Sequence, residues 1–288
     1  MMNKRAKNCV YFVSKDTKKI SQILKDVFRL EFDQQELLFQ LGAIYLNKKR
    51  VFSDELVNSA SPLQIYLNPK RYPASEIVWM QVIVAQEKNF IVINKPWSIP
   101  VHSTEDNFTE NVLFQLRKIL GRELWVTHRL DSAVGGLMVL AKTEKFQREF
   151  NQLVAERRVK KQYRALTERE LAPGWIEHFM APNEGVPKKL SEEFQPGWLK
   201  CVLEVKEVKP WKCDDLKSYW EVVIDLHTGR THQIRAQLSK LGAPVLGDKL
   251  YRGRNRIGYT KHKIALCASK LEWKDSEGTH SFDLAPPF

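Results

Sequence analysis

Apolar residues near the start of the chain recur every three or four positions, first within residues 20–28 and again within 37–41. This spacing gathers the apolar side chains on one face of a helix. Two β-rich runs follow at 43–46 and 63–67, and the residues directly after the first run are basic. We therefore predict a small α/β module of two helices and a basic hairpin, followed by a proline-containing linker at 68–73.

The rest of the chain is dominated by apolar runs of strand length. They lie at 78–84, 90–93, 137–141, 199–208, 218–226, 264–271 and 280–284. Helical spacing is found at 111–120, from Thr143 to Val154, and at 230–242. Residues 171–198, with four prolines and three glycines, are interpreted as a long surface loop or an irregular hairpin. Many strands without strand–helix alternation favour an α+β fold with a mainly antiparallel sheet. We expect two domains, 1–72 with its linker and 73–288.

Charge and cysteine usage narrow the class of protein. The chain has 46 Lys and Arg against 34 Asp and Glu, a formal net charge of +12. This surplus predicts a polyanionic partner, nucleic acid before an anionic membrane surface. No apolar run is long enough to span a bilayer, and the first 13 residues lack the apolar core of a signal peptide. The cysteines have no metal-binding spacing and predict free thiols of a cytoplasmic protein: Cys9, Cys201, Cys213 and Cys267.

One stretch, residues 127–142, joins a polar cluster to a buried strand. His128, Arg129 and Asp131 precede a turn with two glycines, and the apolar run 137–141 follows. A turn braced by a core strand can present a catalytic carboxylate, here Asp131. The simpler alternative is that Asp131 caps the turn and pairs with Arg129.

A second polar stretch follows the strand at 220–226. Gly229 ends that strand, and a helix is predicted from about Arg230 to Gly242. Arg235 lies off the centre of the helix's apolar stripe, where an arginine can reach a carboxylate from another segment.

Together these stretches resemble the RluA-type RNA pseudouridine synthases. The family carries His-Arg-Leu-Asp, two variable residues and Thr-Ser-Gly, then Lys-x-Tyr-x-Ala, then Thr-Gly-Arg-Thr/Ser-His-Gln-hydrophobic-Arg. The matching segments, with two further motifs, are 128–131, 161–165, 228–235, Asn94-Lys95-Pro96 and Gly247-Asp248-Lys249-Leu250-Tyr251. They occur in order over about residues 80–288, and five motifs in sequence are a specific signal.

The resemblance implies an activity and its residues. The enzymes detach uracil from its ribose in RNA and rejoin it through a ring carbon, without a cofactor or metal. Asp131 is the essential carboxylate, as nucleophile at the sugar or as base on a neighbouring sugar proton. Arg235 is its partner, and Tyr163 packs against the target base and is a candidate to take the ring proton late in the reaction. As an alternative, Tyr163 is simply a core aromatic.

The expected partner is a structured ribosomal or transfer RNA that contains the target uridine, with no membrane partner, and we expect a monomer. By resemblance Arg129 enters the RNA stack in place of the flipped uridine, which offsets part of the cost of flipping. The N-terminal module resembles the alpha-L RNA-binding fold, although a role in docking or stability is the alternative. The candidate RNA-binding residues are Arg129, His128, Lys161, Arg230, His232, Lys48, Lys49 and Arg50. Of these, His128 and His232 are expected mainly to buttress their turns.

The chain departs from the family pattern at Val134 and Gly135, where Thr-Ser is usual. Two hydroxyls that can brace the turn are missing, so we expect a loosened turn. The alternative is that Gly135 holds a positive backbone angle or admits a close neighbour, so that a serine would clash. A second departure is Cys267, which stands where the family has histidine. A non-catalytic RNA-binding protein acting in ribosome assembly is the alternative function. A glycoside hydrolase needs two carboxylates beside the scissile bond, and we interpret the motifs as containing no second acid.

Overall fold

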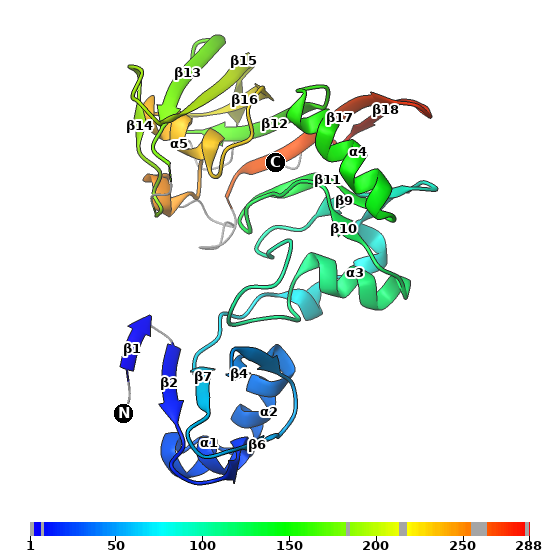
Figure 1. Ribbon diagram of the computed structural model, residues 1–288. Helices are drawn as coiled ribbons and strands as arrows, with labels where there is room; N and C mark the ends of the chain where they lie inside the picture. The colour runs from blue at the N-terminus through cyan, green and yellow to red at the C-terminus, as the bar shows by residue number, and fades with distance from the viewer. Residues whose placement is uncertain (1–2, 7–8, 183–184, 213–217, 255–263, 286–287) are drawn as a thin grey trace. The chain divides into compact units, whose positions relative to one another are not determined.

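The computed structural model describes residues 3–6, 9–182, 185–212, 218–254, 264–285 and 288. The chain folds into two compact units, whose elements are labelled in Figure 1. The smaller unit contains residues 1–77 and 99–122, and the larger contains 78–98 and 123–288. The division differs from a single boundary after residue 72, because the segment 99–122 groups with the N-terminal residues.

The smaller unit contains two short helices, a sheet and a third helix from the later segment. The helices are α1 (Ile20–Phe28), α2 (Phe32–Leu41) and α3 (Val112–Leu120), with a 3₁₀ turn η1 at Ala74–Glu76. The strands are β1 (Asn3–Ala6), β2 (Cys9–Val13), β3 (Lys18–Lys19), β4 (Ile44–Leu46), β5 (Lys49–Val51), β6 (Leu56–Val57) and β7 (Pro62–Tyr66). Five of them form a sheet in the order β1-β2-β7-β4-β5, and β3 pairs with β6. The two helices and basic hairpin are present, whereas the likeness to an alpha-L module and its RNA binding stay predictions.

The basic hairpin β4–β5 turns at Asn47 and Lys48, which both have positive φ angles, 50° and 65°. A two-residue turn of this kind matches the twist of the flanking strands. Lys48 and Lys49 are exposed, but Arg50 is half-buried. Its guanidinium donates to the carbonyls of Gly42 and Thr104 and lies over the ring of Tyr45. Arg50 therefore contributes to the structure of its own unit.

The predicted linker at 68–73 is held by the segment that follows residue 99. The backbone N–H of Lys70 donates to Asp106 at 2.8 Å, and Arg71 pairs with Glu110 at 2.7 Å. This stretch is therefore an anchored part of the smaller unit rather than a free linker.

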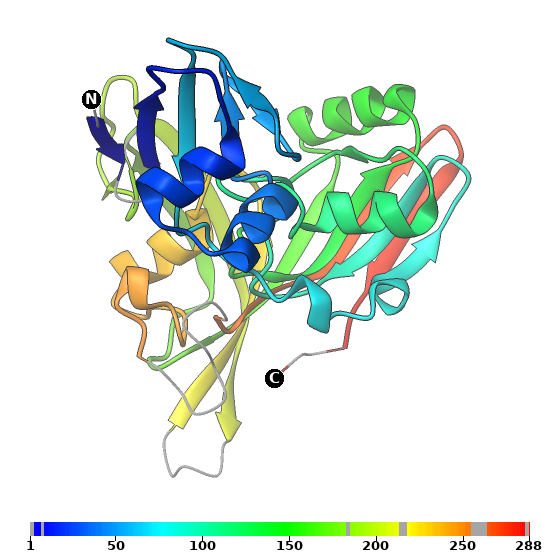
Figure 2. The same ribbon diagram turned by 90° about the horizontal axis from the view of Figure 1, so that it is seen from below.

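The larger unit is built on one extended sheet, and Figure 2 shows its strands lengthwise. Its strands are β8 (Ile83–Gln86), β9 (Phe90–Lys95), β10 (Trp125–Val126), β11 (Gly135–Ala141), β12 (Lys160–Thr167), β13 (Gly174–Met180), β14 (Leu190–Ser191), β15 (Leu199–Lys212), β16 (Ser218–Leu226), β17 (Leu266–Asp275) and β18 (Gly278–Asp283). The order is β14-β13-β15-β16-β12-β17-β11-β9-β8, with β10 beside β11 and β18 beside β17. Among the described strands only β11 and β17 pair in parallel. The predicted α+β fold with a mainly antiparallel sheet is confirmed.

The helices of this unit are α4 (Glu144–Ala155) and α5 (Gln233–Lys240), with 3₁₀ turns η2 (Trp79–Val82) and η3 (Lys249–Tyr251). Figure 1 shows α4 beside β10 and β11, and α5 near β14, at opposite ends of the sheet. Helix α4 begins where the sequence predicts, because the Thr143 hydroxyl accepts from the N–H of Phe146 at 3.2 Å. Phe146 and Phe150 pack with Phe90 and Trp273 in a buried cluster that fixes β9 and β11.

Several predicted elements differ in their bounds. The predicted strand 78–84 is wrong in its first half, because η2 buries Trp79 and Val82 in a 3₁₀ turn before β8 begins. Helix α5 starts later than predicted, because His232 has a left-handed φ of 58°. Residues 171–198 contain the hairpin β13–β14, the second of the two alternatives. Strand β11 starts at Gly135, two residues before the predicted run, so both glycines belong to the strand.

Candidate active site

The side chain of Asp131 projects from the tight turn between β10 and β11. The N–H of Val134 donates to the backbone carbonyl of Asp131 at 3.0 Å and closes the turn. Behind it, His128 Nε2 accepts from the N–H of Val139 at 3.2 Å, and its ring stacks on Phe150. Leu130 and Val134 are buried, while the Asp131 side chain remains 22% exposed. The turn is thus anchored in the core on both sides of a carboxylate that solvent and ligands can reach.

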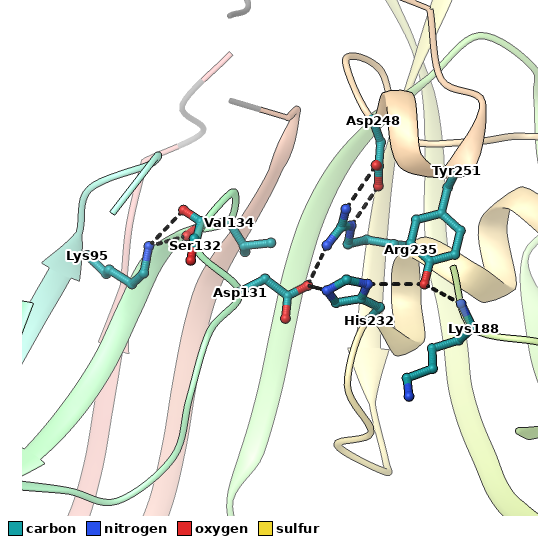
Figure 3. A network of polar contacts seen from close by, with 9 residues as sticks. All are labelled: Lys95, Asp131, Ser132, Val134, Lys188, His232, Arg235, Asp248 and Tyr251. Atoms are coloured by element: carbon teal, nitrogen blue, oxygen red, sulfur yellow. Dashed lines mark hydrogen bonds and ion pairs between the residues drawn. The ribbon is translucent and has the colours of Figure 1, made fainter. Parts of the chain in front are cut away.

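A buried lysine, Lys95, binds backbone carbonyls of the same turn. Lys95, at the end of β9, is fully buried, and its amine donates to three carbonyls. The distance to the Pro96 carbonyl is 2.8 Å. Figure 3 shows the other two contacts, at 3.3 Å to Ser132 and 2.7 Å to Val134. Burial lowers the pKa of Lys95 to about 7, while the negative charge of Asp131 opposes the shift. An ammonium has three donors, so these carbonyls match its charged form.

The two glycines after the turn allow close packing. A Cβ added to Gly135 would lie 2.4 Å from Cδ2 of the Trp97 indole. At Gly136, where φ is +112°, it would lie 2.3 Å from the carbonyl oxygen of Ala268 on β17. Trp97 is itself fixed, because its Nε1 donates to the carbonyl of Ile264 at 3.1 Å. This close contact favours the alternative in which Gly135 admits a close neighbour, here the Trp97 indole, and the loosened turn stays a prediction.

Arg235 reaches Asp131 from α5. Its Nη1 donates to Asp131 Oδ2 at 2.9 Å, and its side chain is only 7% exposed. The loop before the helix is held by Thr228 and Gln233, whose side chains bond to each other at 2.8 Å. Val202 on β15 also donates its N–H to the Thr228 hydroxyl at 2.8 Å. The Thr-Gly-Arg-Thr-His-Gln motif therefore fixes the start of α5 and aims Arg235 at the turn.

A second carboxylate completes the guanidinium's contacts. Asp248 is 1% exposed and accepts from Arg235 Nε at 2.6 Å and Nη2 at 2.9 Å (Figure 3). Burial alone would lower the pKa of Arg235, but hydrogen bonds and charges of Asp248 and Asp131 raise it overall. One buried cation thus bridges two acids. The motifs do contain a second acid, but both oxygens of Asp248 are occupied, so it does not fit the acid of a glycoside hydrolase.

His232 and Tyr251 form a second arm of the network. His232 Nε2 lies 3.6 Å from Asp131 Oδ2, and Nδ1 lies 3.1 Å from the Tyr251 hydroxyl. The Tyr251 ring is buried and lies 5.1 Å from the Arg235 guanidinium carbon. Tyr251 is therefore part of the site's interior.

Two residues of the Lys-x-Tyr motif on β12 are desolvated. Tyr163 is 7% exposed, and burial together with the charge of Asp131 raises its pKa. Burial lowers the pKa of Lys161 to about 8 and that of His128 well below its usual value. No ion pair joins Lys161 to an acid among the described residues. The remaining candidates for RNA contact in this unit, Arg129 and Arg230, are exposed.

Sequence reasoning missed the roles of Lys95, Asp248 and Tyr251. All three lie in motifs that carried the family resemblance, Asn-Lys-Pro and Gly-Asp-Lys-Leu-Tyr, but neither motif has chemistry that is evident without the fold. Their membership in those motifs was the available signal.

Comparisons with known proteins identify the family of this chain. A family model described as RNA pseudouridylate synthase matches residues 89–240. The plant protein RNA pseudouridine synthase 6, chloroplastic, from Oryza sativa subsp. japonica is 34% identical over 217 residues, covering 69% of this chain and 46% of that protein. Ribosomal large subunit pseudouridine synthase D of Buchnera aphidicola subsp. Schizaphis graminum is 26% identical, covering 88% and 81%.

A solved structure, human RNA pseudouridylate synthase domain containing 4, matches with a TM-score of 0.59 at 23% identity. The match covers 73% of this chain and 90% of that one, and shows a shared fold. The chain belongs to the RNA pseudouridylate synthase family. It spans about half the length of the rice relative. Within the described part of the chain, no helix is long and apolar enough to cross a membrane.

Proposed function

We propose that this protein isomerises uridine in RNA to pseudouridine, with Asp131 as the reacting carboxylate. The observation that carries the proposal is the unequal use of the two Asp131 oxygens. Oδ2 accepts from Arg235 at 2.9 Å, whereas Oδ1 has no hydrogen bond to a described residue. A carboxylate held at one oxygen and open at the other is oriented without being blocked.

The reaction requires one charged group and no net redox change. The bond from the ribose C1′ to N1 of uracil breaks, a bond from C1′ to C5 forms, the C5 hydrogen leaves as a proton, and N1 gains one. The electron-poor sugar is attacked by a carboxylate or loses a neighbouring proton to it. Oδ1 of Asp131 fits either step. The guanidinium of Arg235 pairs with this carboxylate and orients it.

Tyr163 is proposed to pack against the target base. Its raised pKa means that the phenol is protonated at neutral pH. A protonated phenol donates a hydrogen bond and is a poor base for the ring proton, and the burial of the ring supports the packing role. The core-aromatic alternative is compatible with the same burial, and Tyr163→Leu separates the two roles through its effect on the rate.

Lys161 and Arg129 are proposed to contact the RNA. Lys161 lies on the same strand as Tyr163, two residues away, and has no carboxylate partner among the described residues. A desolvated cation without an acid is stabilised by an incoming phosphate. Arg129, exposed on the reactive turn, is placed to enter the stack vacated by a flipped uridine.

The RNA is proposed to be ribosomal, because the Buchnera relative is described as a ribosomal large-subunit enzyme. The test is to incubate an unmodified large-subunit rRNA transcript with the purified protein and to map pseudouridine by mass spectrometry. New pseudouridine at defined positions is the expected result. RNA binding without any pseudouridine, in rRNA and in tRNA transcripts alike, would favour the non-catalytic alternative.

A further inference from the structure

A basic pocket is lined in part by Tyr251. It has a volume of about 360 Å³ and is formed by the segment around Lys188, the outer face of α5 and η3. Three of its lining residues are cationic: Lys188, Lys240 and Arg252. They come from three separate segments, so their convergence is a property of the fold and not of one charged run.

One of these cations, Lys240, pairs with an acid only weakly. Glu192 approaches Lys240 at 3.6 Å, with side-chain exposures of 72% and 44%. Exposed pairs of this kind contribute roughly 0–1 kcal/mol, so they yield readily to a competing anion. The Ser239 hydroxyl in the lining is not available as a donor, because it donates to the Tyr251 carbonyl at 2.8 Å. The pocket therefore combines three cationic residues with an apolar wall that includes Leu190, Ala236 and Leu250. The cations fit a phosphate group.

Tyr251 connects the pocket to the reactive carboxylate. Its hydroxyl accepts from the backbone N–H of Lys188 at 3.0 Å and lies 3.1 Å from His232 Nδ1. His232 in turn lies 3.6 Å from Asp131. Figure 3 shows this chain of contacts, with the Lys188 side chain extending away from the Tyr251 hydroxyl. An anion in the pocket is thus separated from Asp131 by two side chains.

We propose that this pocket binds a backbone phosphate of the RNA substrate, near the nucleotide whose base reacts. The inference rests on the proposed function, since it names a contact of the same substrate. The phosphate would fix the strand against α5, the helix that also carries Arg235.

The local charges give the proposal a spectroscopic signature. Burial lowers the pKa of His232, and the charges of Arg235 and Lys188 add to this shift, while those of Asp131 and Asp248 oppose it. A phosphate beside Lys188 offsets one of the cations. It should therefore move the His232 titration toward higher pH.

The test compares Lys240→Gln/Arg252→Gln with a matched control, Lys145→Gln/Arg148→Gln. The control removes the same two residue types from α4, where their side chains are 82% and 74% exposed. RNA affinity is measured from 50 to 300 mM salt on the rRNA transcript. Loss of one phosphate contact should weaken binding and make the log–log salt slope less steep by roughly 0.7. The control should keep a steeper slope than the pocket variant.

A slope like that of the control would overturn the proposal. If the double variant fails to fold, Lys240→Gln alone is measured, because its side chain is exposed. Inorganic phosphate serves as a second probe by NMR of His232. A shift with inorganic phosphate but no change in RNA slope would assign the pocket to a free anion and overturn the RNA contact. Wild-type protein that binds no RNA at all would instead contradict the proposed function.

Discussion

The two carboxylates on Arg235 are held very differently. Asp248 is 1% exposed and uses both oxygens, at 2.6 and 2.9 Å from the guanidinium. Asp131 has a 22% exposed side chain and uses one oxygen, at 2.9 Å. The same cation therefore makes one closed, bidentate contact and one open contact. The difference assigns anchoring to the first acid and reaction to the second.

The bidentate contact with Asp248 explains how Arg235, on helix α5, can orient Asp131 on the turn. A guanidinium fixed by a bidentate carboxylate has lost its freedom before the substrate arrives. It then orients Asp131 without further loss of entropy on binding. The turn itself is held independently by the amine of Lys95.

Removing the shared cation should have the largest effect. Arg235→Leu leaves two acids without their partner, and breaking a buried ion pair costs about 3–5 kcal/mol. The free energy of unfolding in urea should fall by that amount, and the isomerisation rate should fall with it. Arg164→Leu, which breaks the more exposed pair with Glu221, is the control and should cost about 1 kcal/mol or less. Equal losses would refute a special role for Arg235.

Changing Asp248 should show whether it acts by positioning the guanidinium of Arg235. Asp248→Asn keeps the shape but weakens the bidentate contact, so we expect a loss of about 1–3 kcal/mol in stability. The displaced guanidinium should slow single-turnover isomerisation roughly 10–100-fold, with unchanged RNA affinity. Asp225→Asn, which makes the same change at an acid whose carboxylate accepts from Gln162 on the same sheet, is the control for stability. A variant with wild-type rate would mean that Asp248 does not position Arg235.

Lys95→Met should loosen the turn and remove the contribution of Lys95 to the pH dependence of the free energy of unfolding. The folded protein releases the Lys95 proton near pH 7, whereas the unfolded chain keeps it until about 10.5. The unfolded state therefore binds more protons between these values, and the Lys95 contribution to stability rises with pH across that window. The difference in unfolding free energy between wild type and variant should grow from pH 7 to pH 9.

Lys142→Met is the matched control for this prediction, because its buried amine contacts the carbonyl of Glu87 away from the reactive turn. It should slow isomerisation less than Lys95→Met does. A pH-independent difference between wild type and Lys95→Met would contradict the assigned titration.

The smallest effect concerns the close contact behind the turn. Gly135→Ser should destabilise the protein and slow the reaction, because a Cβ there meets the Trp97 indole. Adding Trp97→Ala makes room, so the double variant should lose less than the two single losses combined. Gly185→Ser, at a glycine with no atom within 4 Å of an added Cβ, is the stability control. Strict additivity would argue against the packing account.

Regular elements with strong local signals were predictable. The helix from Thr143 has an N-cap, an apolar stripe and a core partner, and all three are present in α4. The prediction of a strand at 78–84 was wrong in its first half. An apolar run of strand length does not distinguish a strand from a 3₁₀ turn that buries Trp79. The late start of α5 depends on the left-handed backbone of His232, which no spacing reveals.

The site was predictable only where a motif suggested a partner. The contact between Arg235 and Asp131 spans 104 residues and came from the family resemblance. Asp248 lies 13 residues from Arg235 with no periodic relation to it. The fit of Gly135 requires Trp97, and pairwise packing of this kind is fixed by the sheet rather than by local sequence.

The most direct test follows the hydrogen that the reaction must release. Ribosomal RNA carrying tritium at C5 of uridine is mixed with an excess of wild-type protein or Asp131→Asn. Asparagine keeps the shape but cannot act as nucleophile or base, and loss of either role costs about 10²–10⁴-fold in rate or more. We expect rapid tritium release by wild type and almost none by the variant, at equal RNA affinity and stability. Release by Asp131→Asn at a rate comparable to wild type would contradict the assignment of Asp131 as the reacting group.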